Sequence, residues 1–189
     1  MQLTQWRKAV EAPGWIAELK FEGYRLLAEV EGRRVALRTR DGADATGCYP
    51  ELVASLAGLS KTRIVLDGEV CVHDDKGRCD LARLHARSQP RGWYEGADPV
   101  VFVAFDVLVF RDFDMREEPL FERKKKLAAL LARKLPHVLL AQFLPGEAGP
   151  RLFNVAEQMG LEGIVMKRLH STYQEDEPPS GDWVKVKRP

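Results

Sequence analysis

Four short segments of the sequence combine charged residues with apolar, strand-like sequence, and three of them also contain a glycine. They are Glu18–Arg25, Ile64–Val70, Leu161–Arg168 and Trp183–Arg188. A lysine can act as a nucleophile when its amine is neutral, and it can bind phosphate as a cation. Carboxylates can hold a divalent metal ion. Such groups suit phosphoryl-type transfer, which depends on positioning and on neutralising phosphate charge.

Lys20 is the candidate nucleophile of the first segment. In strand alternation Glu18, Lys20 and Glu22 share one face, and a solvated strand face would explain that pattern by itself. A catalytic lysine would need nearby positive charge, burial or a metal to lower its pKa from about 10.4. Gly23 would let the backbone turn closely around a ligand.

The later segments also have two interpretations each. Asp67 and Glu69 flank a glycine in an apolar strand, which indicates either a turn or bulge, or a contact with ribose or metal. Near the end of the chain, alternation puts Lys185 and Lys187 on one face, spaced to bind successive phosphates. Taken singly, each pattern is common in amphipathic edge strands.

The composition is that of an ordinary globular protein. The chain has 189 residues, of which 45% are hydrophobic and 30% charged. This length allows one domain or two small lobes around a cleft, and we expect one folding unit. The longest apolar stretch, Val100–Phe110, is too short for a membrane helix, and the N-terminus lacks a signal-peptide pattern, so we expect a cytoplasmic protein without membrane contact. A net charge of +1 permits nucleic-acid binding only through local clusters.

Several other kinds of site have no support in the sequence. P-loop, Rossmann and zincin motifs are missing. Cys48, Cys71 and Cys79 match no C-x-x-C metal spacing, and we expect reduced thiols. The histidines form no ligand pattern; they are His73, His85, His137 and His170. The cationic run Arg123–Lys126 is expected to be a solvated helix face.

Hydrophobic periodicity predicts an α+β fold built on antiparallel sheets. The predicted strands are Trp15–Phe21, Tyr24–Glu31, Arg33–Thr39, Arg63–His73, Val100–Phe110, Val138–Phe143, Gly163–Lys167 and Trp183–Lys187. The predicted helices are Pro50–Leu59, Asp80–Arg87, Leu120–Leu135 and Pro150–Met159. Loops are predicted at Ser88–Pro99 and Pro178–Gly181.

Together and in this order, the four segments resemble the motifs of the covalent nucleotidyltransferase superfamily, and most closely those of ATP-dependent DNA ligases of the bacterial end-joining type. The resemblance runs from about Trp15 to Pro189. It implies that residues 1–189 form the nucleotidyltransferase (adenylation) domain, in which two antiparallel sheets with flanking helices surround an ATP cleft, an ATP-grasp-like ligase fold. It also implies a bacterial, cytoplasmic and nucleoid-associated enzyme of DNA repair and recombination.

The resemblance assigns the nucleotide chemistry to the first segment. Lys20 would attack the α-phosphate of ATP and carry AMP as a covalent adduct. Glu18 would read the adenine amino group and so select ATP over GTP, and Leu19 would lie in the same ATP-binding site. Glu22 and Gly23 would support it, although DNA ligases usually have aspartate where this chain has Glu22. The longer side chain keeps the charge and moves its position.

Other residues receive their roles from the same resemblance. Arg25 and Arg40 would contact phosphate or ribose and the 5′-phosphate of a nick. Glu69 would hold a ribose hydroxyl or a metal-bound water. Phe105 would stack on adenine, although a plain core phenylalanine would have the same hydrophobic setting.

The last two segments would handle metal and phosphate. Glu162, together with Glu69, would position Mg²⁺ or Mn²⁺, and Lys185 and Lys187 would contact the α-phosphate. AMP would then pass to a 5′-phosphate, and a 3′-hydroxyl would displace it to seal nicked or broken duplex DNA.

The chain ends at Pro189, where such ligases continue into an OB-fold domain that carries a basic last motif. The resemblance therefore implies a catalytic domain without its OB-fold, whose partner could be a protein that supplies one. Two alternatives remain open. One is an RNA ligase or an RNA-capping guanylyltransferase, against which Glu18 argues. The other is a non-catalytic subunit that binds nicks or DNA ends in a repair complex.

Overall fold

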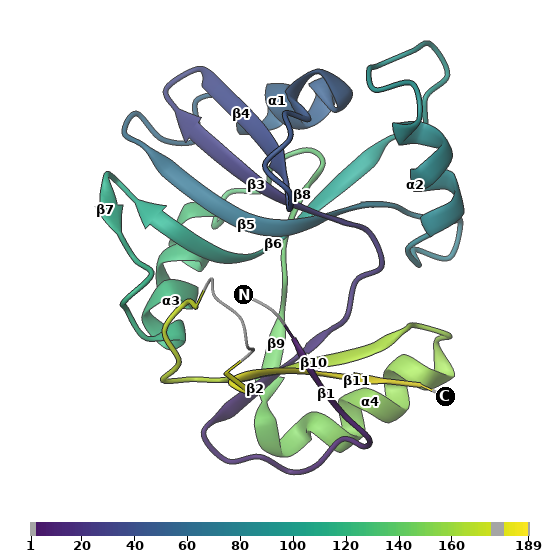
Figure 1. Ribbon diagram of the computed structural model, residues 1–189, viewed down its shortest axis with the longest axis vertical. Helices are drawn as coiled ribbons and strands as arrows, with labels where there is room; N and C mark the ends of the chain where they lie inside the picture. The colour runs from purple at the N-terminus through teal and green to yellow at the C-terminus, as the bar shows by residue number, and fades with distance from the viewer. Residues whose placement is uncertain (1–2, 175–179, 189) are drawn as a thin grey trace. The chain divides into compact units, whose positions relative to one another are not determined.

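The computed structural model describes residues 3–174 and 180–188 (Figure 1). Its strands are β1 (Thr4–Trp6), β2 (Trp15–Leu19), β3 (Tyr24–Glu31), β4 (Arg34–Thr39), β5 (Ile64–Val72), β6 (Val100–Phe110), β7 (Phe113–Asp114), β8 (Val138–Leu140), β9 (Phe143–Pro145), β10 (Gly163–Arg168) and β11 (Trp183–Lys187). Its α-helices are α1 (Pro50–Leu56), α2 (Leu81–Ser88), α3 (Leu120–Leu130) and α4 (Gly149–Gln158). Short 3₁₀ helices are η1 (Thr46–Cys48) and η2 (Gly146–Ala148). Pro178 and Pro179 of the predicted C-terminal loop lie outside the described residues.

The chain forms two compact units. Unit 1 consists of Met1–Phe21, Arg116–Glu122 and Ala141–Pro189, and unit 2 of Glu22–Met115 and Arg123–Leu140. Each unit has its own sheet and its own hydrophobic core. Within the described residues, no helix is long and apolar enough to cross a membrane.

In unit 1 the strands follow the order β1-β11-β10-β2-β9, with β1 parallel to β11 and the other pairs antiparallel. Helix α4 packs on one face of this sheet, where Ala156 meets alternate strand residues such as Ile164, Met166 and Val184. Since neighbouring strand residues point to opposite faces, the residues between them face the other way. That second face receives Glu18, Lys167, Lys185 and Lys187.

In unit 2 the strand order is β4-β3-β5-β6-β7, and β8 adds to β6 in a parallel pairing. The core lies on the face that carries Leu26, Leu66 and Phe102, and residues of α1, α2 and α3 belong to the same core. By the same alternation, the opposite face of the sheet carries Arg25, Asp67, Glu69 and Phe105. Both units therefore use one sheet face for the core and the other for charged residues.

Most predicted elements are confirmed to within one or two residues at each end, but the predicted strand Val138–Phe143 is wrong. The segment forms β8 in unit 2 and β9 in unit 1, because the chain passes from one unit to the other after Leu140. A short apolar run carries no signal for such a crossing. Strands β1 and β7, of three and two residues, were not predicted because they are too short to show alternation.

Helix α3 is shorter than predicted, and its cationic run is only half solvated. Lys125 and Lys126 are exposed as expected, whereas Arg123 is 0% exposed and Lys124 only 4%. Arg123 pairs through its Nε with a buried carboxylate oxygen of Asp106 at 2.9 Å. Arg123 lies one helical turn before Leu127 and therefore faces the core as Leu127 does. The sequence pattern of the helix does not reveal that its partner is Asp106, on the distant strand β6.

Candidate active site

The predicted nucleophile lies in a cluster of three charged residues in unit 1. The Nζ of Lys20 donates to Oε2 of Glu162 at 2.5 Å, and the Nζ of Lys187 pairs with Oε1 of the same carboxylate. The side chains of Lys20 and Glu162 are 18% and 13% exposed, and that of Lys187 is 39% exposed. The structure thus brings together three of the predicted residues, in what we call the lysine–glutamate cluster.

The strand register explains why these three residues meet. Strand β10 lies between β2 and β11, and its first residue, Gly163, is opposite Lys187 and accepts a hydrogen bond from the backbone N–H of Lys20 at 3.0 Å. Glu162 directly precedes Gly163, so its side chain reaches both lysines. Gly163 has φ 145°, and a Cβ there would lie 2.0 Å from the carbonyl oxygen of Val186. A glycine is needed because the neighbouring strand leaves no room for a side chain.

Two opposing influences act on the carboxyl of Glu162. Burial is the largest and raises its pKa. Hydrogen bonds from Lys187 and Lys20, with their positive charges, lower it, and together they outweigh burial, so that the pKa falls below the ordinary value of 4.5. Glu162 is therefore ionised at neutral pH, as a partner of lysine or of a divalent cation must be.

Glu18 lies in a second, deeper ion pair of unit 1. Its Oε2 is 2.6 Å from the Nζ of Lys167, and the two side chains are only 3% and 2% exposed. The Lys167 ammonium also lies 3.9 Å from the ring centroid of Trp183, a cation–π contact. The strand face that Glu18 and Lys20 share is therefore not simply solvated. Glu18 pairs with Lys167 of β10, and Lys20 pairs with Glu162, which directly precedes β10.

In unit 2, Arg25 and Asp67 form a bidentate pair. The Nε and Nη2 of Arg25 donate to the two carboxylate oxygens of Asp67 at 2.9 and 2.5 Å, and Asp67 is 0% exposed. The Arg25 guanidinium also lies over the ring of Phe105, 5.4 Å from its centroid. Of the two carboxylates that flank Gly68, Asp67 therefore holds Arg25 in place.

Phe105 occupies an irregularity of the sheet. Asp67 is opposite Asp106 and Gly68 is opposite Ala104, so that Phe105 has no partner on β5 and forms the extra residue of a β-bulge. Bulges redirect side chains and are frequent near active sites. Phe105 is half-buried and is not part of either hydrophobic core, which argues against a plain core phenylalanine.

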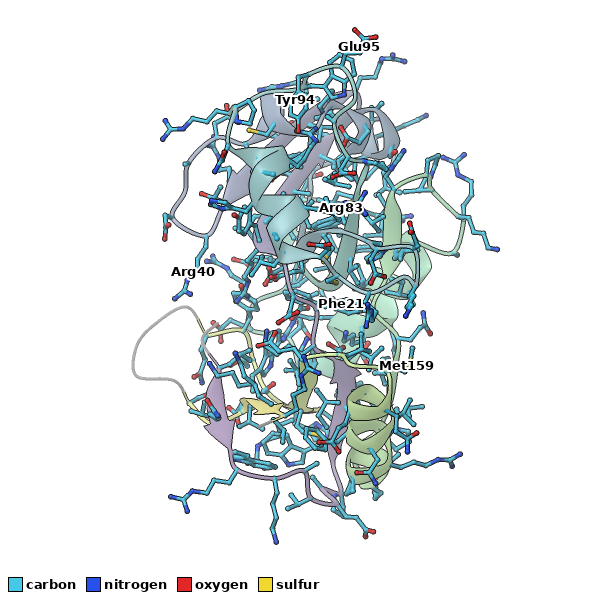
Figure 2. All side chains as sticks on the ribbon, turned by 90° about the vertical axis from the view of Figure 1, so that its right-hand side faces the viewer. Phe21, Arg40, Arg83, Tyr94, Glu95 and Met159 are labelled. Carbon is cyan, nitrogen blue, oxygen red and sulfur yellow. The ribbon has the colours of Figure 1, made fainter. Side chains whose placement is uncertain are left out.

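The remaining predicted residues are placed by their strands and turns. Glu69 is opposite Arg25 in the β3–β5 register, and Lys185 lies on the non-core face of β11. Arg40 follows β4 and is exposed, and Figure 2 shows its side chain pointing away from the ribbon. Gly23 has a packing role, because a Cβ there would lie 2.1 Å from the carbonyl oxygen of Val70.

Sequence reasoning missed the partners of these groups. The sequence gives Lys167 no role of its own, and it leaves Asp67 open between a turn or bulge and a contact with ribose or metal. Both are charged residues inside otherwise apolar strands, and a charge in such a position needs a partner to be tolerated. That signal could have marked them as members of ion pairs, without saying which residues pair with them.

Comparison with known proteins gives a consistent result. Residues 2–187 match the family model described as ATP dependent DNA ligase domain. The chain is 38% identical over 174 residues to the multifunctional non-homologous end joining protein LigD of Pseudomonas aeruginosa. The aligned region covers 92% of this chain and 20% of that protein. It is 33% identical over 178 residues to the corresponding DNA repair protein LigD of Mycobacterium tuberculosis, which covers 94% of this chain and 22% of that protein.

Solved structures of similar proteins share the fold. The ligase domain of M. tuberculosis LigD superposes with a TM-score of 0.80 at 31% sequence identity, over 98% of this chain and 58% of that one. A mycobacterial DNA ligase D solved with ATP and MES has a TM-score of 0.75 at 30% identity, over 98% of this chain and 60% of that one. The chain thus spans about a fifth of the length of the end-joining relatives and somewhat more than half of these solved ligase chains.

Proposed function

Because this chain belongs to the family of ATP-dependent DNA ligase domains, we propose that Lys20 is its nucleophile and carries AMP during the sealing of breaks in DNA. The observation that carries this proposal is the lysine–glutamate cluster, in which a lysine at the end of β2 shares one carboxylate with a second lysine from β11.

The first step transfers AMP from ATP to Lys20. The neutral amine attacks the α-phosphorus, a P–N bond forms, and the bond from that phosphorus to the bridging oxygen of the β-phosphate breaks. Pyrophosphate leaves with the bonding electrons, and the amine loses a proton. Lys187 and Lys185, on the non-core face of β11, contribute positive charge for the α-phosphate oxygens.

Glu162 is the residue of unit 1 that would hold Mg²⁺ or Mn²⁺. Such hard ions take carboxylate oxygens and are commonly held by one or two carboxylates together with substrate phosphates, so the ionised carboxylate of Glu162 fits. When bound, the ion would help to neutralise phosphate charge. In the absence of ATP, the carboxylate of Glu162 would restrain Lys20. When ATP and the metal bind, Glu162 would exchange a lysine partner for the metal.

The roles in nucleotide recognition are proposed residue by residue, from the resemblance of each motif. In unit 2, Phe105 would stack on adenine, Arg25 would contact phosphate or ribose, and Glu69 would bind a ribose hydroxyl or a metal-bound water. The position of Phe105 on a bulge and the fixed geometry of Arg25 support these roles. In unit 1, Glu18 would read the adenine amino group from a position set by Lys167.

The substrate of the later steps is proposed to be nicked or broken duplex DNA, and Arg40 is proposed to contact the 5′-phosphate. The relatives named above are described as end-joining proteins, which supports DNA as the substrate. AMP would move from Lys20 to the 5′-phosphate, and attack by the 3′-hydroxyl would release it. A protein segment or partner that supplies an OB-fold would assist the steps on DNA.

The test is covalent labelling with ATP that carries radioactive phosphorus at the α-position, with Mg²⁺ or Mn²⁺ present. We expect label on the denatured wild-type protein, stable in alkali and released by acid as a phosphoramidate is. Lys20→Ala should abolish the label, and the exposed Lys61→Ala should retain it. Absence of label with either metal would contradict self-adenylation and favour a binding subunit.

A second experiment addresses the substrate. The labelled protein is isolated and mixed with duplexes that contain a nick with a 5′-phosphate, in matched DNA and RNA versions. We expect AMP to move to the 5′-phosphate of the DNA. Transfer to RNA alone would replace the DNA-ligase proposal with an RNA ligase.

A further inference from the structure

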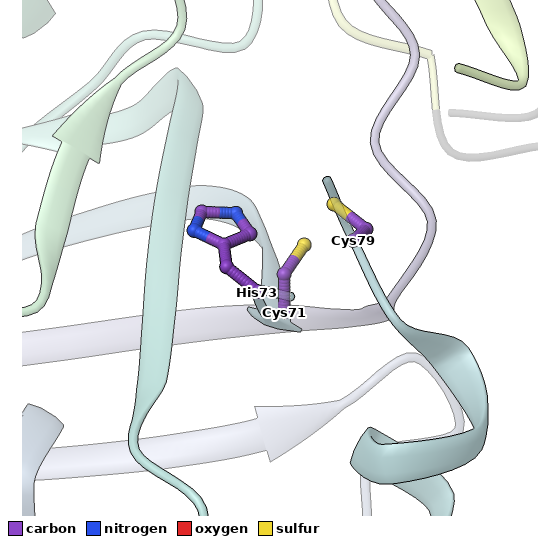
Figure 3. A group of neighbouring side chains, drawn as sticks. All are labelled: Cys71, His73 and Cys79. Carbon is purple, nitrogen blue, oxygen red and sulfur yellow. The ribbon is translucent and has the colours of Figure 1, made fainter. Parts of the chain in front are cut away.

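A second group of potential metal ligands lies at the C-terminal end of β5 and in the turn that follows it. The side chains of Cys71, His73 and Cys79 offer two sulfurs and an imidazole nitrogen, and these ligand atoms all lie within 4.8 Å of one another (Figure 3). Cys71 is buried, and the other two are partly exposed. The C-x-x-C spacing considered in the sequence does not cover this arrangement, in which the three ligands come from two sides of one turn.

The local chain geometry explains how the three residues meet. Cys71 and His73 are two residues apart and so point to the same face of the strand. His73 then pairs with Cys79 in an antiparallel bridge across the intervening turn. All three side chains therefore belong to one hairpin, which makes the group a property of nine consecutive positions rather than of the arrangement of the two units.

The turn between them is rigidly held. Asp74 N–H donates to the Arg78 carbonyl at 2.8 Å, and Gly77 N–H donates to the Asp74 carbonyl at 2.9 Å with φ 76° at the glycine. The carboxylate of Asp74 accepts from the backbone N–H groups of Lys76 and Arg78. A preorganised turn reduces the entropy that ligands lose when they close around an ion.

We propose that Cys71, His73 and Cys79 bind a zinc-type divalent cation, with water as the fourth ligand. In a tetrahedral site with Zn–S of about 2.3 Å and Zn–N of about 2.0 Å, ligand atoms lie roughly 3.5–3.8 Å apart. The ligand atoms, at most 4.8 Å apart, are already near these separations, and His73 and Cys79 are only partly buried. Cys71, packed in the sheet, provides the fixed ligand.

The donor set distinguishes this site from that proposed at Glu162. Two thiolates and an imidazole select zinc and similar ions, whereas carboxylates select magnesium and manganese. The neighbouring carboxylates already have other bonds: Asp74 holds its turn, and Asp80 accepts from the backbone N–H of Arg83 at the start of α2. Among the residues that the structure describes, no fourth Cys, His, Asp or Glu joins the group.

The site also contacts the segment that follows the proposed nucleophile. The backbone N–H of Glu22 hydrogen-bonds to the sulfur of Cys79. A Cβ placed on Gly23 would come within 3.0 Å of the Cys71 sulfur. Bonds from backbone N–H groups to thiolates help to orient metal ligands. A bound ion would therefore tie the hairpin to Glu22 and Gly23, and would stabilise unit 2 whether or not Lys20 reacts with ATP.

The test uses the full 189-residue chain, purified with reductant and stripped with a chelator. ZnCl₂ is titrated against it and bound metal is measured by elemental mass spectrometry. CoCl₂ is titrated in parallel, because cobalt bound by thiolates absorbs strongly in the near ultraviolet. We expect one ion per chain, the thiolate–cobalt band, and a higher Tm with zinc.

Matched variants locate the site. Cys79→Ser and His73→Asn should each weaken zinc binding by at least about tenfold and remove the rise in Tm. Cys48→Ser, which alters the cysteine outside the group, and Lys20→Ala should bind zinc as the wild type does. Failure of the reduced wild type to bind either ion, or a Cys71–Cys79 disulfide in its place, would overturn the proposal, independently of whether Lys20 forms an adenylate.

Discussion

At the scale of single residues, the charged groups proposed for catalysis are held by partners in the protein. Lys20 bonds to Glu162, Glu18 to Lys167 and Arg25 to Asp67. Such pairing offsets the desolvation of partly buried charges and fixes their geometry before a substrate arrives. The proposed nucleotide and metal would have to compete with these pairs, which suits groups that are preorganised and still exchangeable.

Glu162 makes the stability of unit 1 depend on pH. Its pKa is lowered in the folded state, so its contribution to the free energy of unfolding is present above the unfolded pKa of 4.5 and is lost as the pH falls through the folded value. We expect Glu162→Gln to be less stable than the wild type at neutral pH, and the difference to shrink as the pH falls below 4.5. Urea unfolding across this range measures it. The exposed Glu147→Gln should not reproduce the effect, and a difference independent of pH would contradict it.

At the scale of elements, Gly163 allows β10 and β11 to approach closely, and the lysine–glutamate cluster depends on this approach. Gly163→Ala should destabilise the protein by about 1–3 kcal/mol or more, because it adds backbone strain and a clash with Val186. It should also reduce labelling of Lys20. Gly47→Ala is the control, because its Cβ would meet nothing within 4 Å and its φ is not positive. Equal Tm values for the two variants would refute the role of the close contact.

A buried ion pair connects helix α3 to the sheet of unit 2. Arg123 and Asp106 are both 0% exposed. Removing one partner of such a pair leaves a buried charge and costs about 3–5 kcal/mol, whereas replacing both with apolar residues of similar size is often nearly neutral. We therefore expect Arg123→Met to be strongly destabilising and the double variant with Asp106→Leu to recover much of the loss.

Chemical unfolding of both variants and of the exposed Lys125→Ala provides the comparison. Lys125→Ala should remain within about 0.5 kcal/mol of the wild type. If the double variant were no more stable than Arg123→Met, the pair would have a role beyond mutual compensation of charge.

At the scale of the whole molecule, unit 1 depends on unit 2 through the path of the chain. Unit 1 is assembled from three separate segments, and the chain between Phe21 and Arg116 belongs to unit 2. If unit 2 unfolds, that chain becomes a long loop, and the entropy of closing it opposes the folding of unit 1. Damage to the core of unit 2 should therefore lower the stability of unit 1.

Tryptophan fluorescence can follow unit 1 alone. Trp6, Trp15 and Trp183 lie in unit 1, and the fourth tryptophan, the exposed Trp93, can be removed as Trp93→Phe. In this background Leu66→Ala in the core of unit 2, expected to cost about 2–5 kcal/mol, should shift the fluorescence transition to lower denaturant. The exposed Leu139→Ala should not. An unchanged fluorescence midpoint for the core variant would mean that unit 1 folds independently.

The sequence by itself determined most of the elements and the family. Alternation and helical spacing predicted the longer strands of both sheets and the helices, because these periods follow from backbone geometry. The segments that contain Lys20, Glu162, Lys185 and Lys187 resemble, in this order, the motifs of ATP-dependent DNA ligases, and the family match bears this resemblance out. The individual roles of these residues stay predictions until the variants are measured.

Only the tertiary structure decided which charges meet. Pairing of Lys20 with Glu162, and of Arg123 with Asp106, joins residues far apart in the chain, and no periodicity encodes such partners. The division into two units and the split of Val138–Phe143 have the same origin. Strand register and chain crossings set them, and these depend on the packing of the whole chain rather than on any local pattern.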